Sequence, residues 1–425
     1  MCLFFIDFMK KKCQKNESIS ECRHDTICFC LKIRTIFENI LHVPHRKISL
    51  FAAVILTLFA CENNNFSSQD IDNKDITSSN LNHHSNYLTI NNYKSGFYIK
   101  ITNPWDENKA LDEFFVFPDG VEIPQEIRTE RIIKSPVRSA VTFSSTQWSV
   151  FLQLGEIERV SGILEGRSAT VEEVKNLVRE GLIADIGVES SFDREKIISL
   201  KPDIILYTPY PASNCNDLER LTDALCVPFA DYLENTPLGR AEWLKLVGIL
   251  CGREKEASQW FSGIETRYNA LKAKCDTVSR KPTVFSDLPY GGQWYIAGGN
   301  SYIARFFKDA GAEYVFSDDG STASRPIDPE SVLLRAKNAD FWRITNSSVS
   351  EIEQGQLAAQ NELFTHFKAF QQNSIIVCDI IRTSYFETAQ YRPDEVLADF
   401  IAIFHPEILQ NHKPKYYHLG LKVKL

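Results

Sequence analysis

The stretch FDREKIISLKPDIIL, residues 192–206, contains one complete unit of the fold. We expect a helix over residues 194–200 and, after the Lys201-Pro202 pair, a buried strand over residues 204–207, where apolar residues follow one another. Short apolar strands bounded by helices are typical of parallel sheets built from βαβ units. This stretch therefore predicts an α/β fold, and the residues on either side extend the prediction.

The same alternation runs through most of the chain. Around the opening stretch we expect strands at residues 97–102, 113–117, 139–143, 160–164 and 228–232, and helices at residues 146–154, 171–179 and from 216. A second series predicts strands at residues 283–286, 314–317, 341–345 and 375–379, and helices at residues 302–310, 329–339, from 350, and 393–403. The two series predict two α/β lobes.

A long helix is predicted between the two series. Residues 253–275 contain no proline, and apolar side chains recur there at helical spacing (Ala257, Trp260, Phe261, Ile264, Tyr268 and Leu271). Such a helix is about 35 Å long. The predicted architecture is therefore two Rossmann-like lobes with parallel sheets, at residues 96–252 and 277–410, joined by a single long interdomain helix at residues 253–276. One stiff connection lets the lobes open and close only slightly.

The first 60 residues are predicted to be a signal region. Basic residues at 46–47 precede an apolar run at residues 48–60, which as a helix rises about 20 Å and is too short for a bilayer core of roughly 30 Å. Residues 58–61, Leu-Phe-Ala-Cys, resemble the lipobox of bacterial lipoproteins, which implies cleavage before Cys61 and a lipid on its thiol. A plain secretory signal is the alternative.

Three further segments are expected to lie outside the lobes. Residues 1–45 form an extension if translation begins near residues 41–43, as the position of the signal suggests. Residues 61–95 are rich in Asn, Ser and Asp and are predicted to form a flexible tether, in which the pair His83-His84 is solvated. Residues 411–425 are expected to be a C-terminal tail.

Charge, histidine and cysteine usage exclude several functions. The chain has 47 Lys and Arg against 55 Asp and Glu, a formal net charge of -8 without a basic patch, so we expect no nucleic-acid partner. Histidines of the predicted lobes all come late in the chain, so the first lobe offers no imidazole to a metal site between the lobes (His366, His405, His412 and His418). Five cysteines after the signal lack a Cys-x-x-Cys motif, and we expect buried small side chains rather than disulfides (Cys215, Cys226, Cys251, Cys275 and Cys378).

Two α/β lobes joined by one helix behind a lipobox resemble the class III, or helical-backbone, periplasmic substrate-binding proteins of bacterial ABC importers for ferric siderophores, cobalamin or haem. The resemblance covers about residues 131–408 and is carried by the opening stretch together with residues 138–145, 236–243, 294–302 and 391–397. It implies a binding protein and not an enzyme, a monomer without a cofactor of its own whose ligand is a metal chelate. It also implies a lipid anchor in a bacterial membrane, facing the periplasm or the cell exterior, and delivery to a permease dimer.

An internal echo marks two carboxylates. Asp193-Arg-Glu195 opens a predicted helix in the first lobe, and Asp328-Pro-Glu330 opens one in the second. The resemblance implies that Glu195 and Glu330 dock into arginine sockets on the permease. The alternative is that both glutamates only favour the positive end of a helix dipole, worth about 0.3 to 1 kcal/mol each.

The ligand is expected between the lobes, on loops at the carboxyl ends of the strands. Flat aromatic faces suit a macrocycle or catecholate rings, and arginine suits the anionic oxygens of a ferric chelate. The candidates are Trp148, Tyr207, Tyr210, Trp294, Tyr295, Arg325, Arg382, Tyr385, Phe386 and Arg392. Tyr295 matches an aromatic cleft position of the family's cobalamin-binding members, and the glycine pairs at residues 291–292 and 298–299 indicate either close approach to a ligand or tight turns. With three arginines expected at the cleft, ferric siderophore ranks first, then corrinoid or haem.

Two other classes of function stay open. The sequence has no Gly-x-Ser-x-Gly elbow, no His-Glu-x-x-His motif and no P-loop lysine, but paired carboxylates leave a cleft hydrolase as an alternative. A lipoprotein scaffold without a ligand is the third hypothesis. A turnover assay separates an enzyme from a binding protein, which returns its ligand unchanged.

Overall fold

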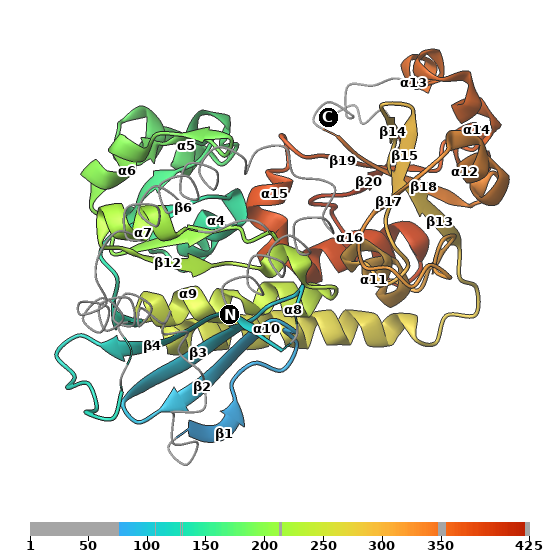
Figure 1. Cartoon of the computed structure of the whole chain (residues 1–425). Coiled ribbons are helices and arrows are strands. Elements are labelled where there is room, and N and C mark those ends of the chain that lie inside the picture. The colour runs from blue at the N-terminus through green and yellow to red at the C-terminus, as the bar shows by residue number, and fades with distance from the viewer. Residues whose placement is uncertain are drawn as a thin grey trace, which may run out of the picture. The chain divides into compact units, whose positions relative to one another are not determined.

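The computed structural model describes residues 76–106, 108–127, 129, 131–211, 215–346 and 354–420 (Figure 1). The predictions for the signal region, the lipobox, Cys61 and the translation start lie outside the described residues. None of the helices in the described ranges combines the length and apolar character needed to cross a membrane.

The first lobe is built on a parallel five-stranded sheet in the order β12-β11-β6-β7-β8. Its strands are β6 (Ala140–Thr142), β7 (Val160–Ile163), β8 (Ala184–Asp185), β11 (Ile204–Tyr207) and β12 (Leu225–Pro228). Its helices are α4 (Ser145–Gln153), α5 (Glu172–Arg179), α6 (Arg194–Leu200) and α7 (Asn216–Thr222). Ile204, Ile205 and Leu206 are fully buried, as the apolar run in the opening stretch predicts.

The second lobe repeats this plan. Its main sheet has the order β16-β13-β18-β19-β20 and is parallel except for the last strand. The strands are β13 (Thr283–Ser286), β16 (Glu313–Tyr314), β18 (Phe341–Asn346), β19 (Ile375–Asp379) and β20 (His418–Leu419). A smaller antiparallel sheet holds β14 (Pro289–Tyr290), β15 (Gln293–Ile296) and β17 (Arg325–Ile327). The helices include α11 (Tyr302–Asp309), α12 (Pro329–Ala336), α13 (Gln354–Gln360), α14 (Lys368–Gln371), α15 (Tyr385–Thr388) and α16 (Pro393–Phe404).

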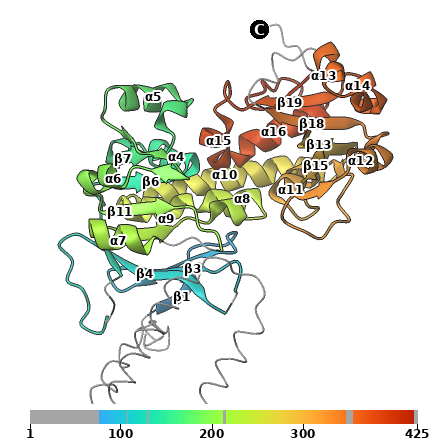
Figure 2. The same ribbon diagram turned by 45° about the horizontal axis from the view of Figure 1, so that its top comes forward.

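One helix, α10 (Glu254–Cys275), passes beneath both lobes, and α8 (Pro237–Glu242) and α9 (Leu244–Leu250) lead into it (Figure 2). Its side chains at helical spacing, Ala257, Phe261, Ile264 and Tyr268, are buried, and it packs against α9 and α16. The predicted fold class, two α/β lobes joined by a single long helix, is confirmed.

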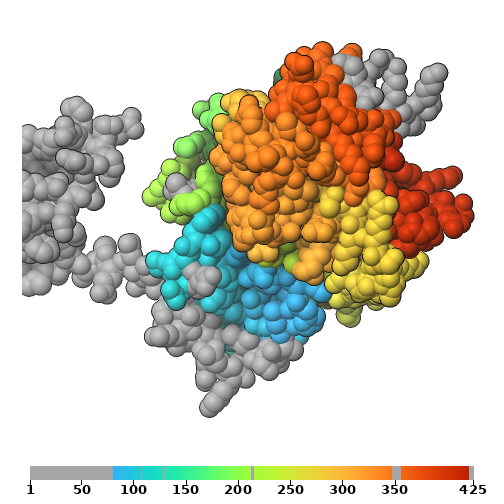
Figure 3. Space-filling view, turned by 90° about the vertical axis from the view of Figure 1, so that its right-hand side faces the viewer, coloured from blue at the N-terminus to red at the C-terminus, as the bar shows by residue number. Residues whose placement is uncertain are grey.

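The predicted tether at residues 61–95 is wrong from residue 76 onward, because the chain there forms strands. A five-stranded sheet runs in the order β1-β2-β3-β4-β5, with β1 (Ile76–Asn80), β2 (Leu88–Tyr93), β3 (Gly96–Thr102), β4 (Ala110–Pro118) and β5 (Ile132–Ser135). We call this the N-terminal sheet. Leu88 and Ile90 alternate with polar residues and are buried in the core of the first lobe. In Figure 3 the blue part of this sheet lies below the orange second lobe and beside α10, in yellow.

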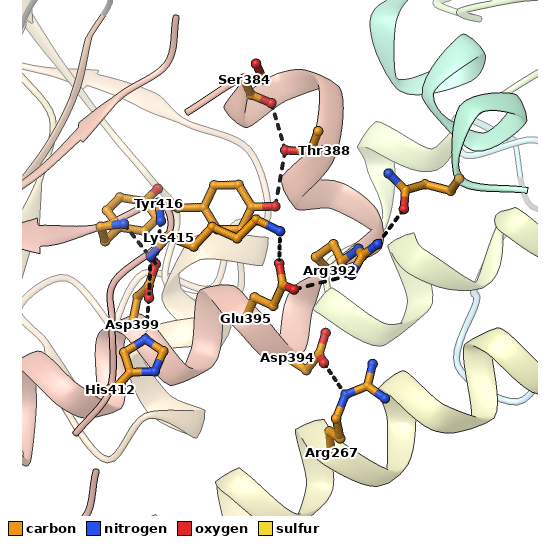
Figure 4. Close-up of polar contacts among 12 residues, drawn as sticks. Arg267, Ser384, Thr388, Arg392, Asp394, Glu395, Asp399, His412, Lys415 and Tyr416 are labelled. Carbon is orange, nitrogen blue, oxygen red and sulfur yellow. Dashed lines mark hydrogen bonds and ion pairs between the residues drawn. The ribbon is translucent and has the colours of Figure 1, made fainter. Parts of the chain in front are cut away.

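The predicted C-terminal tail is also corrected, because its first part belongs to the second lobe. The buried carboxylate of Asp399 on α16 accepts hydrogen bonds from the backbone N–H groups of Lys415, Tyr416 and Tyr417 and lies 2.6 Å from Nε2 of His412 (Figure 4). These contacts seat β20 against β19 and bury both tyrosines.

Two smaller predictions fail in the first lobe. The strand expected at residues 228–232 is displaced: β12 ends at Pro228, and Asp231–Leu233 form a 3-10 turn. Cys215 and Cys226 form a disulfide with their Cα atoms 6.0 Å apart, because the start of α7 lies beside β12, whereas Cys251, Cys275 and Cys378 are free and buried as expected.

Candidate functional site

Two hollows lie in the seam between the lobes. The first, of about 510 Å³, lies between the ends of β6 and β7 and the loop after β19, and Trp148, Ile163, Ile381 and Phe386 are among its lining residues. We call it the aromatic hollow. The second, of about 470 Å³, lies between the residues around α8 and the second lobe and includes Arg240 and Arg343, so we call it the arginine hollow. Because Phe386 lines both, the two hollows adjoin at α15.

The local structure of the first lobe shapes the aromatic hollow. At the end of β6, the buried side chain of Gln147 accepts hydrogen bonds from the backbone N–H groups of Phe143 and Ser144, which fixes the turn into α4. Trp148 follows on the first turn of α4 and is 2 % exposed. Among the described residues that line this hollow, the charged ones are all glutamates: Glu165, Glu189 and Glu387. An apolar hollow ringed by carboxylates disfavours a strongly anionic guest.

The arginine hollow contains two arginines that already have partners. Nε of Arg240 lies 3.2 Å from Oδ2 of Asp231, and Nη1 of Arg343 lies 2.7 Å from Oδ1 of Asp287. Nη2 of Arg343 also donates to the hydroxyl of Tyr417 at 2.8 Å. Burial raises the pKa of Asp231 more than its pairing with Arg240 lowers it. The positive charge of each guanidinium is therefore met by the protein itself.

Three polar atoms around the same hollow are buried without a hydrogen-bond partner among the described residues. They are the hydroxyl of Tyr302, Nε of Arg343 and Oε1 of Gln390. Burial raises the pKa of Tyr302 well above its usual value, so this hydroxyl keeps its proton and can donate. Residues that line this hollow therefore hold two unpaired donors and one unpaired acceptor, and because each atom is buried, a polar guest pairs with them only after neighbouring side chains move.

Some predicted ligand residues reach the seam and others lie beside it. Trp148, Tyr385 and Phe386 line the hollows. Tyr210 is 45 % exposed, and its hydroxyl donates to Glu189 at the edge of the aromatic hollow. Tyr207 is half-buried at the end of β11 and lines neither hollow, and burial raises its pKa to about 12.

The prediction for Trp294 is wrong, because this side chain is fully buried in the core of the second lobe. Its ring packs against Trp342 and Phe367, and its indole N–H donates to the carbonyl of Ser286 at 2.9 Å. Tyr295, the next residue on β15, faces the opposite way and is 46 % exposed outside both hollows.

The two glycine pairs serve the backbone. Gly291 and Gly292 have φ of +58° and +80° in the turn between β14 and β15. A Cβ at Gly298 or Gly299 would collide with the carbonyl oxygen of Ser321 or Asp319. Turns and close loop packing therefore explain both pairs, which leaves no need for an approaching ligand.

The three arginines expected at the cleft line neither hollow. Arg325 pairs with Asp319, and Arg382 is exposed on the loop after β19. Arg392 donates to Oε1 of Gln153 at 2.9 Å and lies 5.2 Å from the ring centre of Trp260, at the base of the seam (Figure 4). The arginines that do reach the seam were missed. Arg343 left a signal, since it interrupts the apolar run of β18.

Glu195 and Glu330 occupy equivalent positions. Each is exposed and is the second residue of its helix, α6 or α12. Each helix is capped by the preceding aspartate: Asp193 accepts from the N–H of Lys196 at 2.9 Å, and Asp328 accepts from the N–H of Ser331 at 2.8 Å. The repeated sequence pattern therefore corresponds to a repeated structure, an aspartate-capped helix with an exposed glutamate as its second residue.

Within the residues that the structure describes, no cluster of three or more His, Cys, Asp or Glu side chains has an arrangement that could hold a metal ion.

Comparisons with known proteins agree with this architecture. An uncharacterized lipoprotein of Methanocaldococcus jannaschii, MJ0878, is 29% identical over 303 residues, which cover 68% of this chain and 70% of the relative. A cobalamin-binding protein of Halobacterium salinarum is 23% identical over 305 residues, 71% of this chain and 78% of the relative.

A solved periplasmic binding protein of Veillonella parvula has the same fold, with a TM-score of 0.55 and 16% identity over 73% of this chain and 98% of that one. The profile of the family described as periplasmic binding protein matches residues 141–380, more than half of the chain. The two lobes and their single connecting helix are those of the class III substrate-binding proteins, and the chain belongs to the periplasmic binding protein family.

Proposed function

We propose that this protein is a lipid-anchored substrate-binding protein of an ABC importer, and that it captures a corrinoid in the seam between its lobes. The observation that carries the proposal is the pair of adjoining hollows, one walled by Trp148 and Phe386 and the other lined by Tyr302 and Gln390, whose hydroxyl and Oε1 have no hydrogen-bond partner among the described residues. A corrinoid is a large flat macrocycle edged with uncharged amides. Aromatic walls suit its faces, and Tyr302 and Gln390 suit its edge.

The lining of the seam favours a corrinoid over a ferric siderophore. The siderophore expectation rested on Arg325, Arg382 and Arg392, and none of them lines a hollow. Arg240 is already paired with the buried carboxylate of Asp231 and Arg343 with the partly exposed carboxylate of Asp287, so a polyanionic chelate would meet little free positive charge. The relative named as cobalamin-binding aligns with 71% of the chain and supports the same choice.

Location and delivery complete the proposal. The disulfide between Cys215 and Cys226 suits an oxidising compartment outside the cytoplasm. A lipid on Cys61 would hold the protein at the membrane. The matched, exposed positions of Glu195 and Glu330 on separate lobes suit two contacts with a permease dimer, which would then receive both lobes together.

A titration of intrinsic tryptophan fluorescence tests the ligand class. Saturable quenching is expected with cyanocobalamin, and much weaker quenching with a ferric catecholate or with haemin. The guest should be recovered unchanged by chromatography, which excludes a hydrolase. Phe386→Ala should weaken cyanocobalamin binding at least tenfold, whereas Tyr290→Ala, at an 82 % exposed aromatic side chain outside the hollows, should leave it unchanged. Binding of the ferric catecholate alone would overturn the corrinoid proposal.

A further inference from the structure

One carboxylate ties the two lobes together. Glu387 belongs to α15 of the second lobe and is 6 % exposed. Its Oε1 accepts from the backbone N–H of Thr170 at 2.7 Å, and its Oε2 accepts from the hydroxyl of Thr170 and the backbone N–H of Val171, both at 2.7 Å. Thr170 and Val171 belong to the first lobe. All the hydrogen bonds of this carboxylate that the structure shows therefore cross the seam.

The contact completes a helix end of the first lobe. Val171 is the N-cap residue of α5, and its apolar side chain makes no capping hydrogen bond. The backbone N–H groups at the start of a helix need an acceptor, and a carboxylate there also meets the positive end of the helix dipole. From the other lobe, Glu387 supplies the acceptor for the N–H of the N-cap residue Val171 and for that of Thr170 before it.

The contact lies in the wall of the aromatic hollow, so breaking it changes the spacing of that wall. Thr170 and Glu387 both line that hollow, next to Phe386. Other bonds across the seam hold α4: the hydroxyl of Tyr391 donates to the carbonyl of Thr146 at 2.9 Å. In Figures 1 and 2, α5 lies farther from α10 than α4 does. A small rotation of the lobes about α10 therefore separates Glu387 from its partners by more than it separates the contacts at α4.

We propose that Glu387 is a reversible latch that holds the seam closed and that must release before a bulky guest passes. Water can replace each bond when the lobes part, because the carboxylate and its donors then face the same opening seam. Glu387 is a positioning residue: it sets the spacing of the walls that hold the guest. The role in guest passage rests on the proposed function, whereas the latch itself does not.

Hydrogen exchange of the unliganded full chain tests the latch without any ligand. In Glu387→Ala, the amides of Thr170 and Val171 should exchange at least tenfold faster. Glu387→Gln should rescue part of the protection, because its amide oxygen still accepts. Glu173→Ala, at an exposed carboxylate of the same helix end, is the matched control and should change these rates less than twofold. Unchanged exchange at both amides in Glu387→Ala would overturn the latch.

A second variant and a kinetic measurement keep the test sharp. Faster exchange in the buried strand β11 of Glu387→Ala would indicate that the whole first lobe is destabilised. In that case Thr170→Ala, which removes only the hydroxyl donor, should still accelerate exchange at Val171. Unchanged exchange at Val171 in Thr170→Ala would contradict the proposal.

In stopped-flow experiments, Glu387→Ala should release cyanocobalamin at least tenfold faster than the wild type and the Glu173→Ala control. Equal release rates would remove Glu387 from guest passage. Failure of the wild type to bind cyanocobalamin would refute the ligand proposal and leave the exchange result standing.

Discussion

Two buried carboxylates of this protein make the same kind of contact in different settings, one among packed elements on one side of the seam and the other across the seam. Glu242 on α8 is fully buried and accepts from the backbone N–H groups of His83, His84 and Ser85 at 3.0, 2.8 and 2.9 Å. Glu387 likewise holds the backbone of a distant segment. Glu242, however, also lies 2.7 Å from the ammonium group of Lys245, and its partners belong to packed elements on one side of the seam.

Further polar contacts hold the segment that Glu242 binds. The segment it holds also bonds Glu234 through Asn86, and Nε2 of His84 lies 2.6 Å from Glu265 on α10. The N-terminal sheet is thereby fastened to both α8 and α10. A carboxylate that binds backbone N–H groups thus serves as a fixed joint between packed elements and, in our proposal, as a releasable contact in the seam.

Glu242→Ala should give the largest loss of stability. It leaves the buried ammonium of Lys245 without a counter-charge, with only the carbonyl of Leu81 as acceptor, and removes the acceptor of three part-buried backbone N–H groups, which costs about 3 to 5 kcal/mol. Glu387→Ala should cost only about 1 kcal/mol, because water reaches the seam. Urea unfolding of both variants checks this order. Equal losses would erase the distinction between the two regions.

Arg267→Ala should have an intermediate effect, because it breaks a second fixed joint. Nε of Arg267 on α10 lies 2.6 Å from Oδ2 of Asp394, a buried carboxylate on α16 (Figure 4). Removal of the guanidinium leaves that charge uncompensated and should cost about 2 kcal/mol in urea unfolding. Arg280→Ala, at an exposed arginine, is the control and should change stability by less than about 0.5 kcal/mol. A loss as small as that of the control would contradict the account of this joint.

The fixed joint should also leave a signature in the pH dependence of stability. Burial alone would raise the pKa of Glu242, but the hydrogen bond and charge of Lys245 and the backbone N–H groups outweigh it, so the pKa lies below its usual value of 4.5. A carboxylate with a lowered pKa contributes stability above pH 4.5 that is lost as the pH falls through its value in the folded protein. The gap between wild type and Glu242→Gln, about 1.4 kcal/mol for each unit of pKa difference, should be constant from pH 7 to 5 and shrink below. A gap that grows on acidification would contradict the assignment.

The smallest effect on stability and binding is expected for Glu195→Ala combined with Glu330→Ala. Both side chains are exposed, so stability should change by less than about 1 kcal/mol and affinity for cyanocobalamin should stay the same. Uptake by cells that depend on this protein should nevertheless stop. Parallel loss of affinity and uptake would favour a role in the lobes themselves over permease docking.

Local patterns were visible in the sequence, whereas long-range pairings were not. The spacing of Phe261, Ile264 and Tyr268 predicted α10, because a helix buries one face through local geometry. In the N-terminal sheet, β3 and β4 were expected as strands but β1 and β2 were missed, because the Asn-rich β2 gains its apolar partners only from distant residues of the first lobe, α9 among them. The strand β15 shows the limit for the site: Trp294 and Tyr295 were both assigned to the cleft, but neighbours on a strand face opposite sides.

The choice of arginines failed for the same reason. Arg343 interrupts an apolar run, but that local signal does not show where its strand lies; the parallel pairing of β13 with β18 carries it to the seam, whereas Arg325 meets Asp319 on its own loop. Residues that matter through contacts across the seam, Glu387 above all, carry no local signal.

Hydrogen exchange of the full chain with and without saturating cyanocobalamin tests the central claim most directly. If the seam holds the guest, protection should rise together at residues 143–148 and 163–170 of the first lobe and at residues 380–387 of the second, while the N-terminal sheet stays unchanged. Protection confined to one lobe, or found on the N-terminal sheet, would contradict a guest held between the two lobes.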